Sequence, residues 1–364
     1  MCLDLPDHDM CPFEIDSKIY MAQTDDLSLP SEIGRAKAVS MGNVVPWPIY
    51  EIKIEEGRID PTLEGAPFPF YKSYIANTPG SGDVYFYIKV RRRVRHESRF
   101  YVLCSGSRAW KPLMAPGAAI ISKPLVENTM FVLDNNLFFS SSRELERDSY
   151  LARFDPIKET WMDMSAADNN LSNFITGRLI SRSEQCRITF SPHISVSLPG
   201  LGSSNYTVCL THEYVEEPPH TPLDKVLAIL VNHLNGLVAL YQYLDVAFEG
   251  ILPPTEGPGR FNFVDLGNGK LCAICSMQLL DSDPYSSAHC FSIFTLSVLK
   301  DFAALQLDSG APPMERDFLQ VTVHRKSVFT MEHRGITGIT NCMRHAFVWP
   351  PTKGGSFQHR TTLL

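Results

Sequence analysis

Two cysteines separated by two residues, Cys272 and Cys275, are the first candidates for metal or redox chemistry. A zinc site of this kind needs a second pair at a suitable spacing, and the other cysteines occur singly, at positions 2, 11, 104, 186, 209, 290 and 342. A redox pair begins a helix, whereas this one lies in an apolar run typical of a strand. Residues i and i+3 of a strand face opposite sides of the sheet. We therefore predict two buried structural thiols.

Eleven histidines invite metal and acid–base interpretations. His212 is followed by Glu213, but Glu216 stands where the zinc-binding pattern His-Glu-x-x-His needs its second histidine. Four histidines are neighbours in the sequence only: His193, His212, His220 and His233. A histidine outside such a pattern is most often exposed or hydrogen-bonded, and we predict that state for these four.

The sequence contains no complete motif for nucleophilic or phosphate chemistry. A nucleophile elbow needs Gly-x-Ser-x-Gly, and none occurs. Three short glycine pairs, Gly80/Gly82, Gly200/Gly202 and Gly267/Gly269, lack the remainder of a phosphate-binding loop. Adjacent carboxylates such as Glu216 and Glu217 have no geometric partner. We therefore predict no catalytic residue, no cofactor-binding residue, no metal ligand and no cofactor.

The composition limits the compartment and the class of partner. With 33 basic and 40 acidic residues the formal charge is −7, which does not favour nucleic acid. The one basic run, Lys89 to Arg95, is predicted to be a charged edge strand. The longest apolar run, Val226 to Val231, is much shorter than the about 20 residues of a membrane helix. No secretory signal pattern is present, and the irregular cysteines suit reduced thiols, so we expect a cytoplasmic or nuclear protein without a membrane partner.

The apolar residues of the chain recur with the period of a β-strand rather than with that of a helix. Short apolar or alternating runs are separated by Gly, Pro, Asn and Asp, which is typical of consecutive antiparallel hairpins. Four hairpins are predicted: 84–104, turning near His96; 130–139, turning at Asp134-Asn135-Asn136; 226–244, turning at Asn235-Gly236; and 261–275, turning at Gly267-Asn268-Gly269. For Asn235-Gly236 we predict a type I′ turn, which needs two residues with positive φ.

A weak repeat of about fifty residues underlies the hairpins. Trp110 and Trp161 follow similar strands and lie 51 residues apart, and Ile59 lies 51 residues before Trp110. Units of this length with four strands are typical of a kelch-like β-propeller, in which a recurring aromatic packs one sheet on the next. We predict an all-β propeller of six blades. Seven blades are possible if the 87 residues between Trp161 and Phe248 contain two, and the alternative fold is a pair of β-sandwiches.

Several segments resemble a known family. The segment Arg153 to Trp161 is similar to the closing strand of a kelch blade, although the Gly-Gly pair usual in such blades is absent from the repeats. The segments 263–272, 291–298 and 319–327 resemble, in this order, an uncharacterised plant family that is abundant in grasses and related to kelch and F-box-associated propellers. The resemblance covers about residues 100–330 and implies a plant origin and a propeller. It brings no known activity.

The same resemblance puts two functions in question. Plant specifier proteins, which are kelch propellers, bind iron through Glu, Asp and His at four-residue steps. Glu144 and Asp148 have the first step, but Ala152 stands where the histidine is needed. An F-box would be an N-terminal helical segment of about forty residues. Leu29 to Ile33 is only weakly similar to part of an F-box. We therefore expect no direct contact with a ubiquitin-ligase complex.

The sequence thus predicts one propeller domain over residues 1–350 and a flexible tail over 351–364. We expect a non-enzymatic module that binds an unidentified protein partner through exposed loops. The alternative is a plant enzyme for a small molecule, with its pocket in the central funnel. The segments predicted to form the recognition surface are 165–184, 216–224 and 281–289. Whether 165–225 is an insert or a seventh blade stays open.

Overall fold

The structure, a computed structural model, describes the residues of 24 strands, one short 3-10 helix and the turns between some of them. The described residues are 10–15, 18–23, 49–53, 56, 58–61, 72–77, 82–91, 96–117, 126–143, 146–167, 169–174, 186–189, 195–196, 198, 205–217, 221–250, 260–266, 269–278, 286–299, 311–332, 347–349 and 360–362. Beyond the helix η1 and one helical turn at 171–174, the regular structure in these residues is β.

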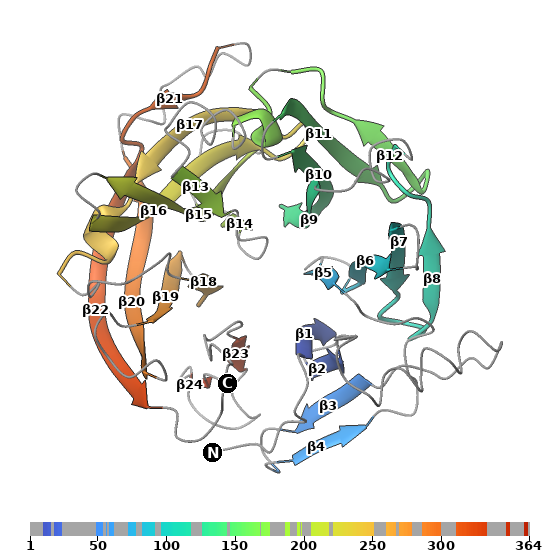
Figure 1. Cartoon of the computed structure of the whole chain (residues 1–364), viewed down its shortest axis with the longest axis horizontal. Helices are drawn as coiled ribbons and strands as arrows, with labels where there is room; N and C mark the ends of the chain where they lie inside the picture. The colour runs from blue at the N-terminus through green and yellow to red at the C-terminus, as the bar shows by residue number, and fades with distance from the viewer. Residues whose placement is uncertain are drawn as a thin grey trace. The chain divides into compact units, whose positions relative to one another are not determined.

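Three sheets of four antiparallel strands come first along the chain. The first contains β1 (Met10–Ile15), β2 (Lys18–Gln23), β3 (Ile49–Lys53) and β4 (Arg58–Pro61). The second contains β5 (Lys72–Asn77), β6 (Val84–Arg91), β7 (His96–Leu103) and β8 (Trp110–Leu113). The third contains β9 (Val126–Leu133), β10 (Asn136–Arg143), β11 (Glu146–Asp155) and β12 (Thr160–Asp163). In each sheet the strands are hydrogen-bonded in chain order, as a meander (Figure 1).

The fourth sheet is larger, and a fifth four-stranded sheet follows it. The fourth contains β13 (Cys186–Thr189), β14 (Ser195–Val196), β15 (Tyr206–Glu217), β16 (Thr221–Asn232), β17 (Val238–Tyr243) and β21 (Met314–Glu315). The fifth contains β18 (Arg260–Asp265), β19 (Lys270–Gln278), β20 (Ser286–Val298) and β22 (Leu319–Glu332). The helix η1 (Asp245–Ala247) precedes β18, and β23 (Phe347–Trp349) pairs with β24 (Arg360–Thr362).

Successive meanders of this kind are the blades of a β-propeller. The first strands of neighbouring sheets lie side by side, β1 beside β5 and β5 beside β9, which is how blades meet. The all-β propeller predicted from the sequence is therefore confirmed. The region 165–225 contributes β13, β14 and β15 to the fourth sheet, so its described strands form no sheet of their own.

The chain divides into two compact units. The first unit contains Met1–Ser141 and Ala152–Met162, and the second contains Ser142–Leu151 and Asp163–Leu364.

Turn chemistry explains the hairpins. Asp134 and Asn135 both have positive φ, at 43° and 64°, and join β9 to β10 as a two-residue type I′ turn. The Asn235-Gly236 hairpin also forms, but its predicted turn type is wrong. Only Gly236 has positive φ there, and the Gly236 amide donates to the Asn232 carbonyl across a wider loop. The Asn232 and Asn235 side chains accept from backbone amides in that loop, which stabilises it without a type I′ turn.

In the first unit the two repeated tryptophans pack between sheets, as predicted. Trp110 on β8 lies against Phe86, with ring centroids 4.9 Å apart, in a cluster that also contains Phe13 of β1. Trp161 on β12 lies against Phe100 of β7, with ring centroids 5.6 Å apart. Each outer strand therefore carries a ring that packs on the preceding sheet, and burial of such a side chain stabilises the fold by roughly 1.5–3 kcal/mol.

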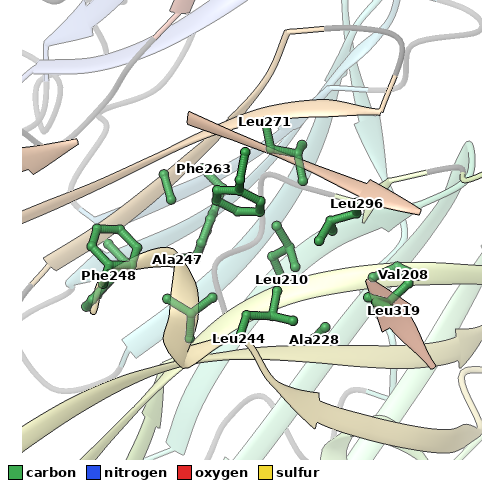
Figure 2. Packing of buried hydrophobic residues seen from close by; sticks show 14 of the residues in the cluster. Val208, Leu210, Ala228, Leu244, Ala247, Phe248, Phe263, Leu271, Leu296 and Leu319 are labelled. Carbon is green, nitrogen blue, oxygen red and sulfur yellow. The ribbon is translucent and has the colours of Figure 1, made fainter. Parts of the chain in front are cut away.

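The main core of the second unit lies between the fourth and fifth sheets. Figure 2 shows part of this cluster, with Val208 and Leu210 from β15 opposite Phe263 from β18 and Leu271 from β19. The segment after β17 closes one side of it with apolar side chains, those of Leu244, Ala247 and Phe248. Alternate residues of β15 face this core because successive side chains of a strand point to opposite sides.

Two further predictions, the edge strand at 89–95 and the flexible tail at 351–364, fall partly on described residues. The basic run was expected on an edge strand, but its residues 89–91 end β6, which lies between β5 and β7, so that placement is wrong. A strand can carry charge at its end without lying at the edge of the sheet. Residues 360–362 of the segment predicted as a tail form β24, and the remainder of 351–364 lies outside the described residues.

Candidate functional site

The cysteine pair lies in β19 and faces two different cores. Cys272 packs with Val264 and Ile274, whereas Cys275 belongs to the main core of the second unit. Both cysteines are buried and neither forms a disulfide, as the strand pattern predicts. Burial raises the pKa of Cys272 to about 11, which disfavours the thiolate that metal binding or redox exchange needs.

His212 is the described histidine that departs most from expectation. It is 4% exposed on β15, and its ring stacks on Phe261 with centroids 4.7 Å apart. Its Nδ1 has no hydrogen-bond partner in the described structure, so the prediction of an exposed or hydrogen-bonded ring is wrong for this residue. Burial lowers its pKa to about 4, so the ring is neutral at physiological pH.

The other histidines and carboxylates singled out from the sequence are not brought together. His233 is buried after β16, while His193, His220 and Glu144 lie outside the described residues, as does the side chain of Asp148. Ala152 is fully buried in β11. Among the described residues no group of three metal-ligating side chains converges.

The burial of the Glu213 carboxylate on β15 was not predicted from the sequence. Glu213 is fully buried, and its Oε2 accepts a hydrogen bond of 2.6 Å from the Tyr243 hydroxyl. The Lys225 ammonium lies 5.3 Å from the centre of the Tyr243 ring, on the same face of the sheet. Three neighbouring strands supply these residues, and no spacing within one segment could reveal them. The cluster holds β15, β16 and β17 together through polar contacts that are satisfied inside the sheet.

The segments predicted as recognition loops are described only in part. Residues 216–217 and 221–224 belong to β15 and β16, a long hairpin rather than a free loop, and 286–289 begin β20. Residues 169–174 pack on the turn after β16, where the Leu171 amide donates to the Gly236 carbonyl. The remaining residues of these segments lie outside the described structure.

An exposed apolar surface lies on the outer strands of the first unit. The tight turn between β11 and β12 presents Ile157 with 93% of its surface exposed. The Asp155 side chain supports this turn, because its Oδ1 accepts from the Ile157 and Lys158 amides at 3.0 and 3.1 Å. Those amides, Lys158 first, hold the pKa of Asp155 below its usual range. Ile157 is therefore a fixed apolar knob rather than part of a loose loop.

Two contacts join this turn to the end of β8. The Trp161 indole Nε1 donates to the Met114 carbonyl at 2.8 Å, and Met114 itself is 71% exposed. Lys111 forms an ion pair with Glu159, which raises the pKa of the lysine. We call Lys111, Met114, Ile157, Glu159 and Trp161 the Trp161 surface. It combines exposed apolar side chains with a partly buried tryptophan and a charge pair.

Comparisons with protein-family models and with curated proteins give no match to this chain. Solved structures similar to it include the fructofuranosidase from Schwanniomyces occidentalis, at 9% identity and a TM-score of 0.41 over 87% of this chain and 62% of that one. The Bacillus subtilis arabinanase Arb43A has 11% identity and a TM-score of 0.36, over 80% and 96%. TolB from Acinetobacter baumannii has 11% identity and a TM-score of 0.34, over 79% of this chain and 50% of its own. This chain thus spans half the length of TolB.

The described helices are too short to cross a bilayer.

Proposed function

We propose that this protein is a non-enzymatic, kelch-like propeller that binds another protein. The observation that carries the proposal is Ile157, an almost fully exposed aliphatic side chain held at the tip of a well-supported turn. Ile157 lies four residues before Trp161, whose indole bonds to the exposed Met114, and we infer that these apolar side chains contact a protein partner.

The composition of the Trp161 surface supports a protein partner rather than a small molecule. Tryptophan and methionine are enriched at the centres of interfaces, and charged side chains surround them. Here Met114 and Trp161 lie together, and the Lys111–Glu159 pair lies beside them. Ile157 lies in the turn between β11 and β12 with 93% of its surface exposed, so we expect it to enter a pocket on the partner.

We further propose six blades. The described strands form six sheets, of which the last has two strands, β23 and β24. β23 lies close to β18 of the fifth sheet, in the place of a following blade. Deletion of residues 333–364 is then expected to lower the melting temperature, because the fifth sheet loses its neighbour. Identical melting curves of the truncated and full chains would contradict the sixth blade.

The binding proposal is tested by site-specific photo-crosslinking. A photoreactive phenylalanine analogue at position 157 is expected to capture a protein from a plant extract. The same analogue at position 314 is the matched control, because Met314 is also an exposed apolar residue (54%) but lies in the second unit.

Two charge variants complete the test. Ile157→Asp is expected to abolish capture of that protein by the purified chain, while Met314→Asp leaves it unchanged. Both variants should have the same melting temperature as the wild type, because both side chains are exposed. Equal capture from positions 157 and 314, or full capture by Ile157→Asp, would refute the Trp161 surface as the binding site.

A further inference from the structure

The outermost strand of the fifth sheet is β22, and its outer edge pairs with no strand in the part of the chain that the structure describes. In the described part of the chain β20 is its only strand neighbour. In an antiparallel ladder each residue directs its backbone N–H and C=O to one side, and the side alternates along the strand. The residues of β22 that bond to β20 can therefore be told from those that face outward.

Two backbone hydrogen bonds fix this alternation. The Leu296 amide donates to the Gly269 carbonyl, so the even residues of β20 bond to β19 and the odd residues bond to β22. The Leu299 amide donates to the Phe318 carbonyl, which agrees with this assignment at the other end of β22. Arg325 pairs with Ile293 and Val323 with Phe294, so His324 is the extra residue of a β-bulge. Before the bulge Leu319 faces outward, and after it Lys326, Val328 and Thr330 do.

The outward groups at the start of β22 are already paired, by a side chain. Gln242 of β17 donates from Nε2 to the Leu319 carbonyl at 3.0 Å and accepts the Leu319 amide on Oε1 at 2.8 Å. This amide group reproduces the two hydrogen bonds of a neighbouring strand. The corresponding groups of Val328 have no such partner in the described structure.

The side chains around Val328 make this edge of the sheet apolar and positively charged. Val328 is 45% exposed and Phe329 is 53% exposed, and Phe329 packs edge-on against Phe291. Arg325 lies on the same face of the sheet as Phe329, because both pair with odd residues of β20. Arg325 is exposed, and the sequence from Leu319 to Met331 contains three cationic or imidazole side chains and no carboxylate. This edge is thus positive and apolar in a chain whose formal charge is −7.

We propose that residues 325–331 of β22 bind an extended, acidic segment of a partner protein by β-strand addition. Backbone bonds would form to Lys326, Val328 and Thr330, and the partner strand would run antiparallel, as every pairing within the fifth sheet does. An apolar residue would lie opposite Phe329, and an acidic residue four positions later would lie opposite Arg325. These two would be non-hydrogen-bonded pairs, in which side chains approach most closely.

This inference gives the proposed binding role a second surface and a partner class. It rests on that role only in assuming a protein partner. β22 belongs to the second unit and the Trp161 surface to the first, so failure of either test leaves the other interpretable.

The test uses fluorescein-labelled synthetic peptides and the full chain. The peptide TFTSTET carries the apolar and acidic residues at the required spacing, and TFTSTKT replaces the acid with lysine. The wild type is expected to bind TFTSTET about threefold more tightly, the ratio expected of one cross-strand charge pair. Arg325→Glu is expected to reverse the preference. Absence of saturable anisotropy change up to millimolar chain concentration would overturn the proposal, as would an unchanged preference in Arg325→Glu.

A backbone variant separates strand addition from other binding. Val328→Pro removes only an outward N–H, so the ladder to β20 keeps its bonds and the fold is expected to persist. Peptide affinity should then fall at least about threefold, while the matched variant Val328→Thr, which keeps the N–H, retains it. Equal affinities of these two variants would overturn the proposal. So would a dimer of the free chain in sedimentation that Val328→Pro dissociates, because a second copy would then occupy this edge.

Discussion

His212 and Phe261 stack ring on ring across the interface between the fourth and fifth sheets, with centroids 4.7 Å apart and planes inclined by 29°. Both side chains are buried, and Phe261 belongs to the apolar core between these two sheets. Burial at this contact disfavours the charged form of the imidazole, and the stability of the second unit therefore depends on pH.

The first prediction follows from that relationship. The pKa of His212 is about 4 in the folded chain and 6.5 in a free histidine, so between these values the unfolded chain binds a proton that the folded chain does not. The free energy of unfolding should therefore fall as the pH decreases from about 6.5 to about 4, by roughly 2–3 kcal/mol for this group. Urea unfolding at pH 7 and pH 4.5 measures it. In His212→Leu the free energy of unfolding should decrease less between these two pH values, by that amount. Equal decreases in the variant and the wild type would contradict the assignment of the pH dependence to His212.

The second prediction concerns Trp161. Its ring lies 5.2 Å from Phe154 and 5.6 Å from Phe100, so Trp161→Ala opens a cavity between the second and third sheets. We expect a loss of about 3 kcal/mol, the lower end for a large aromatic because the ring is partly exposed. Thermal or urea unfolding measures it, and Ile157→Ala is the control, with an expected change below about 0.5 kcal/mol. Equal stability of the two variants would show that Trp161 does not pack between sheets.

The third prediction concerns Gln242. Its amide is buried and bonds to three backbone groups, the Phe318 amide and both groups of Leu319. Gln242→Leu leaves these groups unsatisfied and should lower the free energy of unfolding by about 2–4 kcal/mol. Gln320→Leu, at an exposed position of β22, should change it by less than about 0.5 kcal/mol. If the two variants unfold at the same urea concentration, the Gln242 bridge is not formed.

The fourth prediction concerns the thiols. Burial raises the pKa of Cys272 and Cys290 to about 11 from 9, which lowers the thiolate fraction at neutral pH about 100-fold. Maleimide labelling of the native chain, read by peptide mass spectrometry, should modify Cys104 long before these two. In denaturant all three should react at similar rates. Rapid labelling of Cys272 in the native chain, or its protection by added zinc, would contradict a purely structural role.

Much of the fold could be predicted from short-range patterns. The Asp134-Asn135 turn, the alternation around it and the 51-residue spacing of Trp110 and Trp161 indicate hairpins that recur in four-stranded units. These features are local because turn type and side-chain period depend on a few adjacent residues. The turn at Asn235-Gly236 was predicted less well, since asparagine side chains there replace backbone bonds with side-chain ones.

The surfaces and buried groups could not be predicted in the same way. Whether Lys89 to Arg91 lie on an inner or an edge strand depends on which strands pair, and that is decided by contacts between distant segments. In the segments predicted as recognition loops, residues 216–217, 221–224 and 286–289 are strand and 169–174 pack on a neighbouring turn, while Ile157 is exposed in a turn of four residues. Length and polarity of a segment do not reveal which apolar side chain remains uncovered.

The sequence by itself determined that the chain is all β, that its hairpins recur with a tryptophan on the closing strand, and that Cys272 and Cys275 face opposite sides of one strand. Each of these depends on the geometry of a single strand or turn. The tertiary structure decided that His212 is buried against Phe261, that Glu213 meets Tyr243, and that Gln242 pairs with Leu319. These pairs come from strands 30 to 77 residues apart, or from different sheets, and only the packing of sheets brings their side chains within reach.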